Sequence, residues 1–214
     1  MNAFRFEKMS AAGSWTTAVF SLGAGVWLFF LLRWLESSVL PGLGGFFPGS
    51  VFPGSLFPAG VLNALAEESG KLCLFPLFRL FCRLTRPDKP PRSAAAPGLY
   101  ALLAVMTFAI VENSVYFLRF PTTAIYLRLP YSYSIHLVTG TAFALMDLAG
   151  SYAFTPLLLA ASTAYHAALN SLSLTAGSPL VLAAAGAVNI LLLMLLAGRW
   201  RNTLTVRRLM NAGS

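Results

Sequence analysis

Charged side chains are scarce in this 214-residue chain, at 10% of all residues, and Asp and Glu together number only seven. A soluble domain carries about 25% charged residues, so this chain cannot cover a water-facing surface and is not a soluble globular protein. Disorder is excluded too, because disordered chains are poor in aromatic residues, and 13% of this chain is aromatic. With 57% hydrophobic residues and a mean hydropathy of +0.71, the composition predicts an all-α, polytopic membrane protein.

Cysteine is nearly absent as well. Cys73 and Cys82 lie nine residues apart in one apolar stretch, which places them on opposite faces of a helix and excludes a disulfide within it. The formal net charge is +8. In a membrane protein such an excess marks cationic flanks that face anionic lipid headgroups, so we expect the lipid bilayer as a partner and no nucleic acid.

Long apolar stretches predict about six transmembrane helices, or seven, at about 20 residues per span. They form a single integral membrane domain over residues 1–214, because the length leaves no room for a soluble domain, and the polar motifs fall in residues 60–175. The predicted spans are Ser14–Leu35, Val61–Leu84, Leu99–Leu118, Ser132–Tyr152, Pro156–Leu174 and Pro179–Gly198.

Basic residues set the expected orientation. Six spans with both termini in the cytoplasm place eleven of the fifteen Lys and Arg residues inside and three outside, with Lys71 within a span. The opposite orientation would invert that ratio and violate the positive-inside rule. We therefore expect cytoplasmic N- and C-termini.

A short repeat follows the first predicted span. Its three copies are Phe47-Pro48-Gly49-Ser50, Phe52-Pro53-Gly54-Ser55 and Phe57-Pro58-Ala59-Gly60. Proline at this density argues against a regular helix, and the phenylalanines argue against a solvated loop. The repeat is interpreted as an interfacial segment with its rings among the headgroups; a flexible lid over a site is the alternative.

Ionisable residues are concentrated where a bilayer disfavours them. A charged side chain at the centre of a membrane helix costs about 2.5–3.5 kcal/mol on insertion scales, yet four of the seven acids and both histidines fall inside predicted spans. These residues are Glu67, Glu68, Glu112, Asp147, His136 and His166. Asp147, near the end of its span, is interpreted as a packing acid; the others are the candidate functional residues.

Their spacing places polar side chains one helical turn apart. Lys71 lies three residues after Glu68 and four after Glu67, so it can pair with either carboxylate. Glu112 with Tyr116, and His166 with Asn170, are also four residues apart and share a helix face. A rise of about 1.5 Å per residue brings both Glu positions and both His positions to a similar depth in the outer half of the membrane, between the second and fifth helices.

Convergent Glu and His side chains have several possible uses. They can activate a water for attack on a carbonyl, with Asn or a second His at the oxyanion. They can bind a divalent metal that activates the water, or relay protons or cations in a transporter. Simple cross-linking of helices is the remaining interpretation, and seven polar residues on four helices argue against it.

At these residues the chain resembles the PrsW family of intramembrane proteases, which is related to the CPBP superfamily of CAAX-type prenyl endopeptidases. Four elements carry the resemblance, in order and on successive predicted spans. They are Glu67-Glu68-Ser69-Gly70-Lys71, Glu112 with Tyr116, His136 with Gly140, and His166 with Asn170. The CAAX-type branch has Arg one position after the place of Lys71, so the chain is more similar to PrsW.

The resemblance implies an intramembrane protease of the glutamic or the metal-dependent type. Glu67 or Glu68 with His136 would activate water, while His166 and Asn170 would stabilise the tetrahedral oxyanion. Lys71 would hold one glutamate charged and oriented. Glu112, with Tyr116 beside it, would be a supporting acid, a metal ligand or a substrate contact.

The resemblance leaves the cofactor open. Glu68, Glu112, His136 and His166 would suit zinc, and they equally suit a water held by hydrogen bonds; the metal-independent form is favoured. The implied substrate is a single-pass transmembrane protein, typically an anti-sigma factor, and the implied location is the bacterial cytoplasmic (inner) membrane.

Three alternatives stay open. A CAAX-type prenyl endopeptidase would cleave only C-terminally prenylated peptides. A proton- or cation-coupled transporter would show ion-dependent flux without cleavage, although the chain shows no internal hydropathy repeat of the kind common in transporters. A catalytically inactive scaffold is disfavoured because every motif position is present. The sequence leaves the oligomeric state open.

Overall fold

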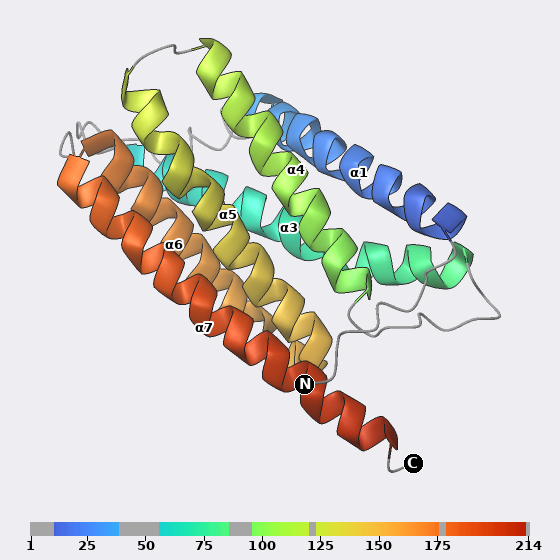
Figure 1. Cartoon of the computed structure of the whole chain (residues 1–214). Coiled ribbons are helices and arrows are strands. Elements are labelled where there is room, and N and C mark those ends of the chain that lie inside the picture. Colours follow the sequence, from blue (N-terminus) through green and yellow to red (C-terminus); the bar gives the residue numbers. More distant parts are fainter. Residues whose placement is uncertain (1–10, 39–55, 86–95, 120–122, 176–178, 213–214) are drawn as a thin grey trace.

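The computed structural model describes residues 11–38, 56–85, 96–119, 123–175 and 179–212, and in this part of the chain only helices and short turns occur (Figure 1). The all-α prediction is thus confirmed for the described residues. The elements in chain order are α1 (Ala11–Ser38), α3 (Leu56–Thr85), α4 (Ala96–Arg119), α5 (Thr123–Ala149), the short 3-10 helix η1 (Tyr152–Phe154), α6 (Thr155–Thr175) and α7 (Pro179–Ala212).

Three helices differ most from their predicted bounds. Helix α3 begins at Leu56 and includes the third copy of the Phe-Pro repeat, because proline is tolerated in the first turn of a helix, where its missing N–H is not needed. The first two copies lie outside the described residues. Helix α5 begins nine residues earlier than predicted and ends at Ala149, where Gly150 takes a positive φ of 70°. Helix α7 continues past Gly198 to Ala212.

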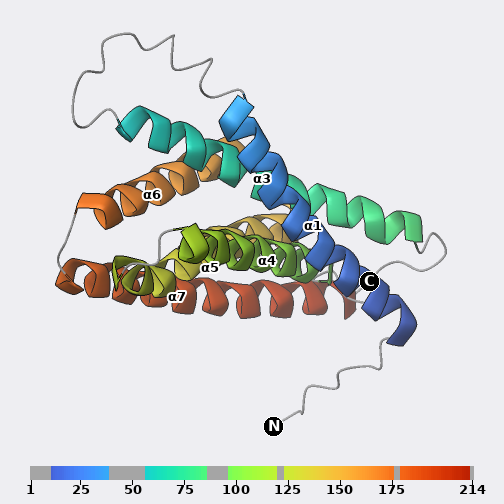
Figure 2. The same ribbon diagram turned by 90° about the horizontal axis from the view of Figure 1, so that it is seen from above.

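The helices pack in two layers with α1 across them. Helices α4, α5 and α7 lie side by side in one layer, while α3 and α6 pair in the other (Figure 2). Helix α1 runs against α4. Their contact is close because Gly25 faces the α4 backbone: a Cβ at that position would lie 2.3 Å from the Ala104 carbonyl oxygen. The polar motif residues come from both layers, so the site forms where the layers meet.

Aromatic side chains fill the space between α1, α3, α4 and α5. The Phe20 and Phe81 rings stack at 4.1 Å, and the Phe75 and Phe143 rings join α3 to α5 at 6.3 Å. Gly140 lets α5 approach α4, since a Cβ there would lie 3.0 Å from Val105. Gly140, part of one motif, thus has a packing role one turn from His136.

The outer surface is strongly apolar. Trp27 on α1 is 77% exposed and Leu180 on α7 is 78% exposed, with many other large apolar side chains exposed on the same helices. Three helices of the described part are long and apolar enough to cross a membrane, through Trp15–Leu35, Ala96–Leu118 and Ala183–Val206. This is fewer than the six or seven predicted, because α3, α5 and α6 carry the polar side chains described below. Such a surface is typical of a membrane protein.

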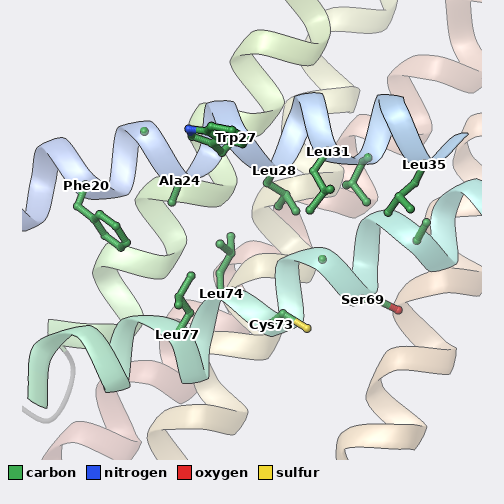
Figure 3. A pocket seen from close by; sticks show the side chains of 14 residues that line it. Phe20, Ala24, Trp27, Leu28, Leu31, Leu35, Ser69, Cys73, Leu74 and Leu77 are labelled. Carbon is green, nitrogen blue, oxygen red and sulfur yellow. The ribbon is translucent and has the colours of Figure 1, made fainter. Parts of the chain in front are cut away.

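An apolar groove of about 800 Å³ separates part of α1 from α3 (Figure 3). Gly70 and Cys73 lie on its α3 side. Glu68 is two positions from Gly70 and Lys71 is two positions from Cys73, about 200° around the helix, so these two side chains lie on a different face of α3 from the groove. Cys73 and Cys82 are not joined by a disulfide.

Asp147 has the packing role expected of it. Its carboxylate is buried, lies 2.7 Å from Arg79 Nε and accepts a 2.8 Å hydrogen bond from the Tyr152 hydroxyl. Arg79 also donates to the Asp147 backbone carbonyl. The ion pair joins α3 to the end of α5, so Asp147 links the two layers at a place separate from the site.

Candidate active site

Lys71, Glu68 and His166 form a buried chain of contacts within the α3–α6 layer. Lys71 Nζ lies 2.5 Å from Glu68 Oε1, and both side chains are fully buried. The same oxygen lies 2.7 Å from His166 Nδ1. The i,i+3 spacing on α3 brings the ammonium to the carboxylate, and α6 supplies the imidazole. The carboxylate therefore fixes one ring nitrogen of His166.

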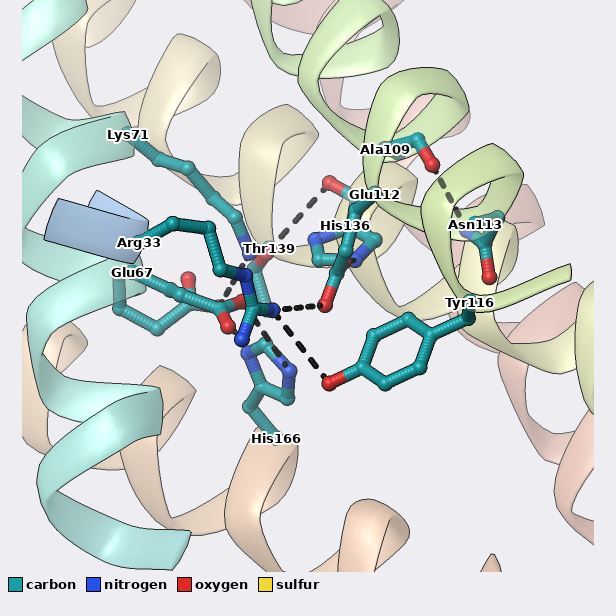
Figure 4. A network of polar contacts seen from close by, with 11 residues as sticks. Arg33, Glu67, Lys71, Ala109, Glu112, Asn113, Tyr116, His136, Thr139 and His166 are labelled. Atoms are coloured by element: carbon teal, nitrogen blue, oxygen red, sulfur yellow. Dashed lines mark hydrogen bonds and ion pairs between the residues drawn. The ribbon is translucent and has the colours of Figure 1, made fainter. Parts of the chain in front are cut away.

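Arg33, Glu112 and His136 form a matching chain within the other layer and α1 (Figure 4). Glu112 Oε2 lies 2.9 Å from His136 Nε2, and Glu112 Oε1 lies 3.3 Å from Arg33 Nη2. The same guanidinium nitrogen lies 3.4 Å from the Tyr116 hydroxyl, with the Tyr116 ring 5.4 Å below the guanidinium carbon. A cation, a carboxylate and an imidazole thus follow one another a second time.

The two chains meet at their imidazole ends. The rings of His136 and His166 lie edge to face, 5.3 Å apart with an interplanar angle of 89°. Glu67 lies beside them, with Oε2 3.6 Å from His166 Nε2. One ligand atom from each of these three residues falls within 4.8 Å of the others, and all three side chains are buried. This meeting point is the centre of the candidate site.

Hydrogen bonding determines which ring nitrogens carry a proton and which carry a lone pair. An ionised carboxylate only accepts, so in the neutral rings the protons lie on His166 Nδ1 and His136 Nε2, where Glu68 and Glu112 accept them. His166 Nε2 and His136 Nδ1 then carry lone pairs. His136 Nδ1 is buried and has no hydrogen-bond partner among the described residues. A buried polar atom without a partner is costly, so this nitrogen points to a ligand.

Formal charge supports the same conclusion. Three carboxylates face the site, from Glu67, Glu68 and Glu112, against two cations, Lys71 and Arg33. With both rings neutral, one negative charge is left over among three carboxylates that are all buried. Buried charges are tolerated when they are paired or bind metal. The arrangement can therefore accept a divalent cation, or a water that donates its protons.

An aromatic side chain closes one side of the site. Phe108 of α4 packs its ring 5.4 Å from the His136 ring in an edge-on geometry. Its centroid also lies 6.0 Å from Lys71 Nζ, within the reach of a cation–π contact. Phe108 is itself buried, so its ring keeps water from His136 and Lys71 on that side. In a dry site such electrostatic contacts are stronger than in water.

The structure brings together seven of the eight predicted residues: Glu67, Glu68, Lys71, Glu112, Tyr116, His136 and His166. Asn170 lies one turn beyond His166 on α6 and is half-buried. Glu112, which the sequence left without a defined role, holds His136. Glu68 holds His166, and the residue beside both rings is Glu67.

Arg33 is a site residue that the sequence analysis missed. Arg33 belongs to none of the four motifs that select the other residues. The available signal is its position inside the predicted span Ser14–Leu35, where a cation needs a partner. Its partners are 79 and 83 residues away in the chain, so only the packing of α1 on α4 reveals them.

Replacing Arg33 with glutamine tests the second chain of contacts. Removing the guanidinium leaves Glu112 without its cation, so we expect the activity of the site to fall about 10- to 100-fold, as for partners that orient a functional histidine. Arg33→Lys should recover part of the loss. An ammonium restores the positive charge but not the planar group that contacts both Glu112 and Tyr116. Arg201→Gln, at an exposed arginine of α7, is the control. Equal activity of Arg33→Gln and Arg201→Gln in a cleavage assay would contradict this role.

Comparison with known proteins finds no matching family model, curated protein or solved structure.

Proposed function

We propose that this protein is a membrane-embedded endopeptidase of the PrsW type, which hydrolyses a peptide bond with water activated at Glu67. The observation that carries the proposal is the meeting of Glu67, His136 and His166 at one buried point, with a separate carboxylate on the far nitrogen of each ring. Histidine held by a carboxylate is the usual arrangement for a hydrolytic site.

In this proposal all six helices cross the bilayer, in the bacterial cytoplasmic membrane with both termini in the cytoplasm. Helices α3, α5 and α6 have 30, 27 and 21 residues, each enough for a span of about 20. Their polar side chains pair with one another inside the bundle, which is how membrane helices tolerate ionisable residues. The site then lies between the second and fifth helices.

Each residue has a part in the proposed hydrolysis. The Glu67 carboxylate takes a proton from a water, and the water oxygen bonds to the scissile carbonyl carbon. As the tetrahedral species breaks down, the bond from carbon to nitrogen is lost and the leaving amine receives the proton from Glu67. Asn170 would donate its amide N–H to the oxyanion. Glu68 and Glu112 keep the rings of His166 and His136 in place.

The site residues fit a zinc ion, although the sequence favoured a metal-free form. One carboxylate oxygen of Glu67, with His136 and His166, would hold it, because three protein ligands and an open position are typical of catalytic zinc. The second Glu67 oxygen would remain the proton acceptor. The carboxylates on the far ring nitrogens match the outer contacts of metal-binding histidines. Such an ion would supply Lewis-acid polarisation of the scissile carbonyl. Glu68 and Glu112, candidates from the sequence, would support the ligands instead.

The proposed substrate is a single-pass transmembrane protein, such as an anti-sigma factor. The apolar outer surface over α1 and α7 suits a substrate that approaches within the bilayer. A soluble peptide would first have to leave water.

Cleavage in proteoliposomes tests the proposal. The purified full chain is incubated with a panel of single-pass substrates, prenylated peptides and, as control, a Glu67→Ala/Glu68→Ala variant. We expect cleavage of a single-pass substrate by the wild type and none by the control. Cleavage restricted to prenylated peptides would support the CAAX-type alternative. No cleavage, together with ion-dependent flux, would support a transporter.

A further inference from the structure

Asn189 is an isolated buried polar residue on an otherwise exposed helix. Its neighbours Val188 and Ile190 on α7 are 52% and 59% exposed, whereas Asn189 is fully buried. An asparagine within an apolar helix disfavours membrane insertion unless its amide is hydrogen-bonded. Asn189 is therefore buried for a polar contact with the neighbouring helices.

The oxygen and the nitrogen of the Asn189 side-chain amide both form hydrogen bonds. The Tyr165 hydroxyl on α6 donates to Asn189 Oδ1. Asn189 Nδ2 donates to Ser134 Oγ on α5 at 2.5 Å. One side chain on α7 thus binds α5 and α6 at once, which no apolar side chain at this position can do.

The two partners stand next to the site histidines. Tyr165 directly precedes His166, and Ser134 lies two residues before His136. Helix α6 packs mainly on α3, and α5 mainly on α4 and α7, so α5 and α6 touch each other over a small area. Direct contacts between the two helices that carry the histidines are therefore few.

We infer that Asn189 is a positioning residue that sets the His136–His166 geometry through Ser134 and Tyr165. The inference rests on the proposed function only for its kinetic effect. The structural part, a clamp that keeps the rings 5.3 Å apart, holds whatever reaction the site performs. Asn189 touches neither ring, and it acts by fixing the backbone segments that carry them.

Asn189→Leu and Tyr165→Phe test the clamp in the full chain in proteoliposomes. Leucine is similar in size to asparagine and suits a membrane helix, while phenylalanine removes only one hydroxyl. Asn202→Leu, at an exposed asparagine of the same helix, is the matched control. The measurements are kcat and KM for cleavage, thermal unfolding, and ¹⁵N NMR of the histidine rings. Because the chain contains two histidines, every ring signal comes from the site.

We expect Asn189→Leu and Tyr165→Phe to lower kcat about 10- to 100-fold, the effect of a small misplacement of reacting groups, with KM changed less than about twofold. The ring nitrogen signals should move away from the carboxylate-bound tautomers in Asn189→Leu. The double variant should be no slower than Asn189→Leu alone, because both changes break the same contact. Asn202→Leu should match the wild type in every measurement.

Two results would overturn the inference. One is a wild-type kcat and unchanged ring signals in Tyr165→Phe, which decides the question even where Asn189→Leu fails to fold. The other is a fall in thermal stability with ring signals identical to the wild type, which would make the contact structural only. If the wild type cleaves no substrate, the proposed function fails, and the NMR comparison alone then decides the clamp.

Discussion

Replacing Glu67 with glutamine is expected to lower kcat by about 10²–10⁴-fold, the contribution of a general base, while leaving the thermal stability close to that of the wild type. Glutamine keeps the size of the side chain but cannot take a proton. It also removes one of the three carboxylates that face two cations. The two remaining carboxylates then balance the two cations, so the folded state is not destabilised by an unpaired charge. Steady-state cleavage in proteoliposomes and thermal unfolding measure the two effects.

The neighbouring variant Glu68→Gln is the matched control and should behave differently. It leaves the fully buried Lys71 ammonium without its 2.5 Å partner, and breaking a buried ion pair costs about 3–5 kcal/mol. We therefore expect a clear fall in stability as well as activity. Adding Lys71→Met should restore much of the stability but not the activity, because His166 still lacks its carboxylate. Equal stability losses in Glu67→Gln and Glu68→Gln would contradict the distinct roles given to the two residues.

Removing divalent metal is expected to abolish cleavage, and adding zinc back should restore it. The physical reason is the donor set: two neutral ring nitrogens and the Glu67 carboxylate converge within 4.8 Å, and one negative charge is left over around them. Elemental analysis of the purified protein should find about one zinc per chain, as a site of this ligand type holds one ion. The assay is cleavage after treatment with a chelator, then after titration with zinc.

Variants of the supporting carboxylates sharpen the metal test. Glu112→Gln should weaken zinc binding about 10- to 100-fold, the usual effect of losing the partner of a metal-binding histidine. Asp147→Asn, at the buried carboxylate outside the site, should leave zinc affinity unchanged. Cleavage that survives complete chelation would exclude the metal-dependent form, and Glu67 would then activate water unaided, as the sequence alone favoured.

Much of the candidate site was predictable because helical spacing is regular. Glu68 and Lys71 are three residues apart, so their contact follows from the geometry of one helix. The clustering of Glu67, Glu112, His136 and His166 was predictable for a different reason. Ionisable groups in apolar helices need one another, and the spans deliver them to a similar depth.

What escaped prediction depends on contacts between distant segments. Adjacent glutamates project about 100° apart, but only the position of α6 decides that Glu68, and not Glu67, binds His166 Nδ1. Arg33 joins the site because Gly25 lets α1 pack closely on α4. The position of Arg33 within α1 does not predict a contact with Glu112, which lies 79 residues away on α4.

The sequence by itself determined the helical class, the apolar character and the set of residues able to do chemistry, because composition and helical period are local properties. The tertiary structure alone decided which carboxylate serves which histidine, how Arg33 and Asn189 take part, and where the two layers meet. Each of these depends on side chains far apart in the chain, whose approach is set by the packing of whole helices.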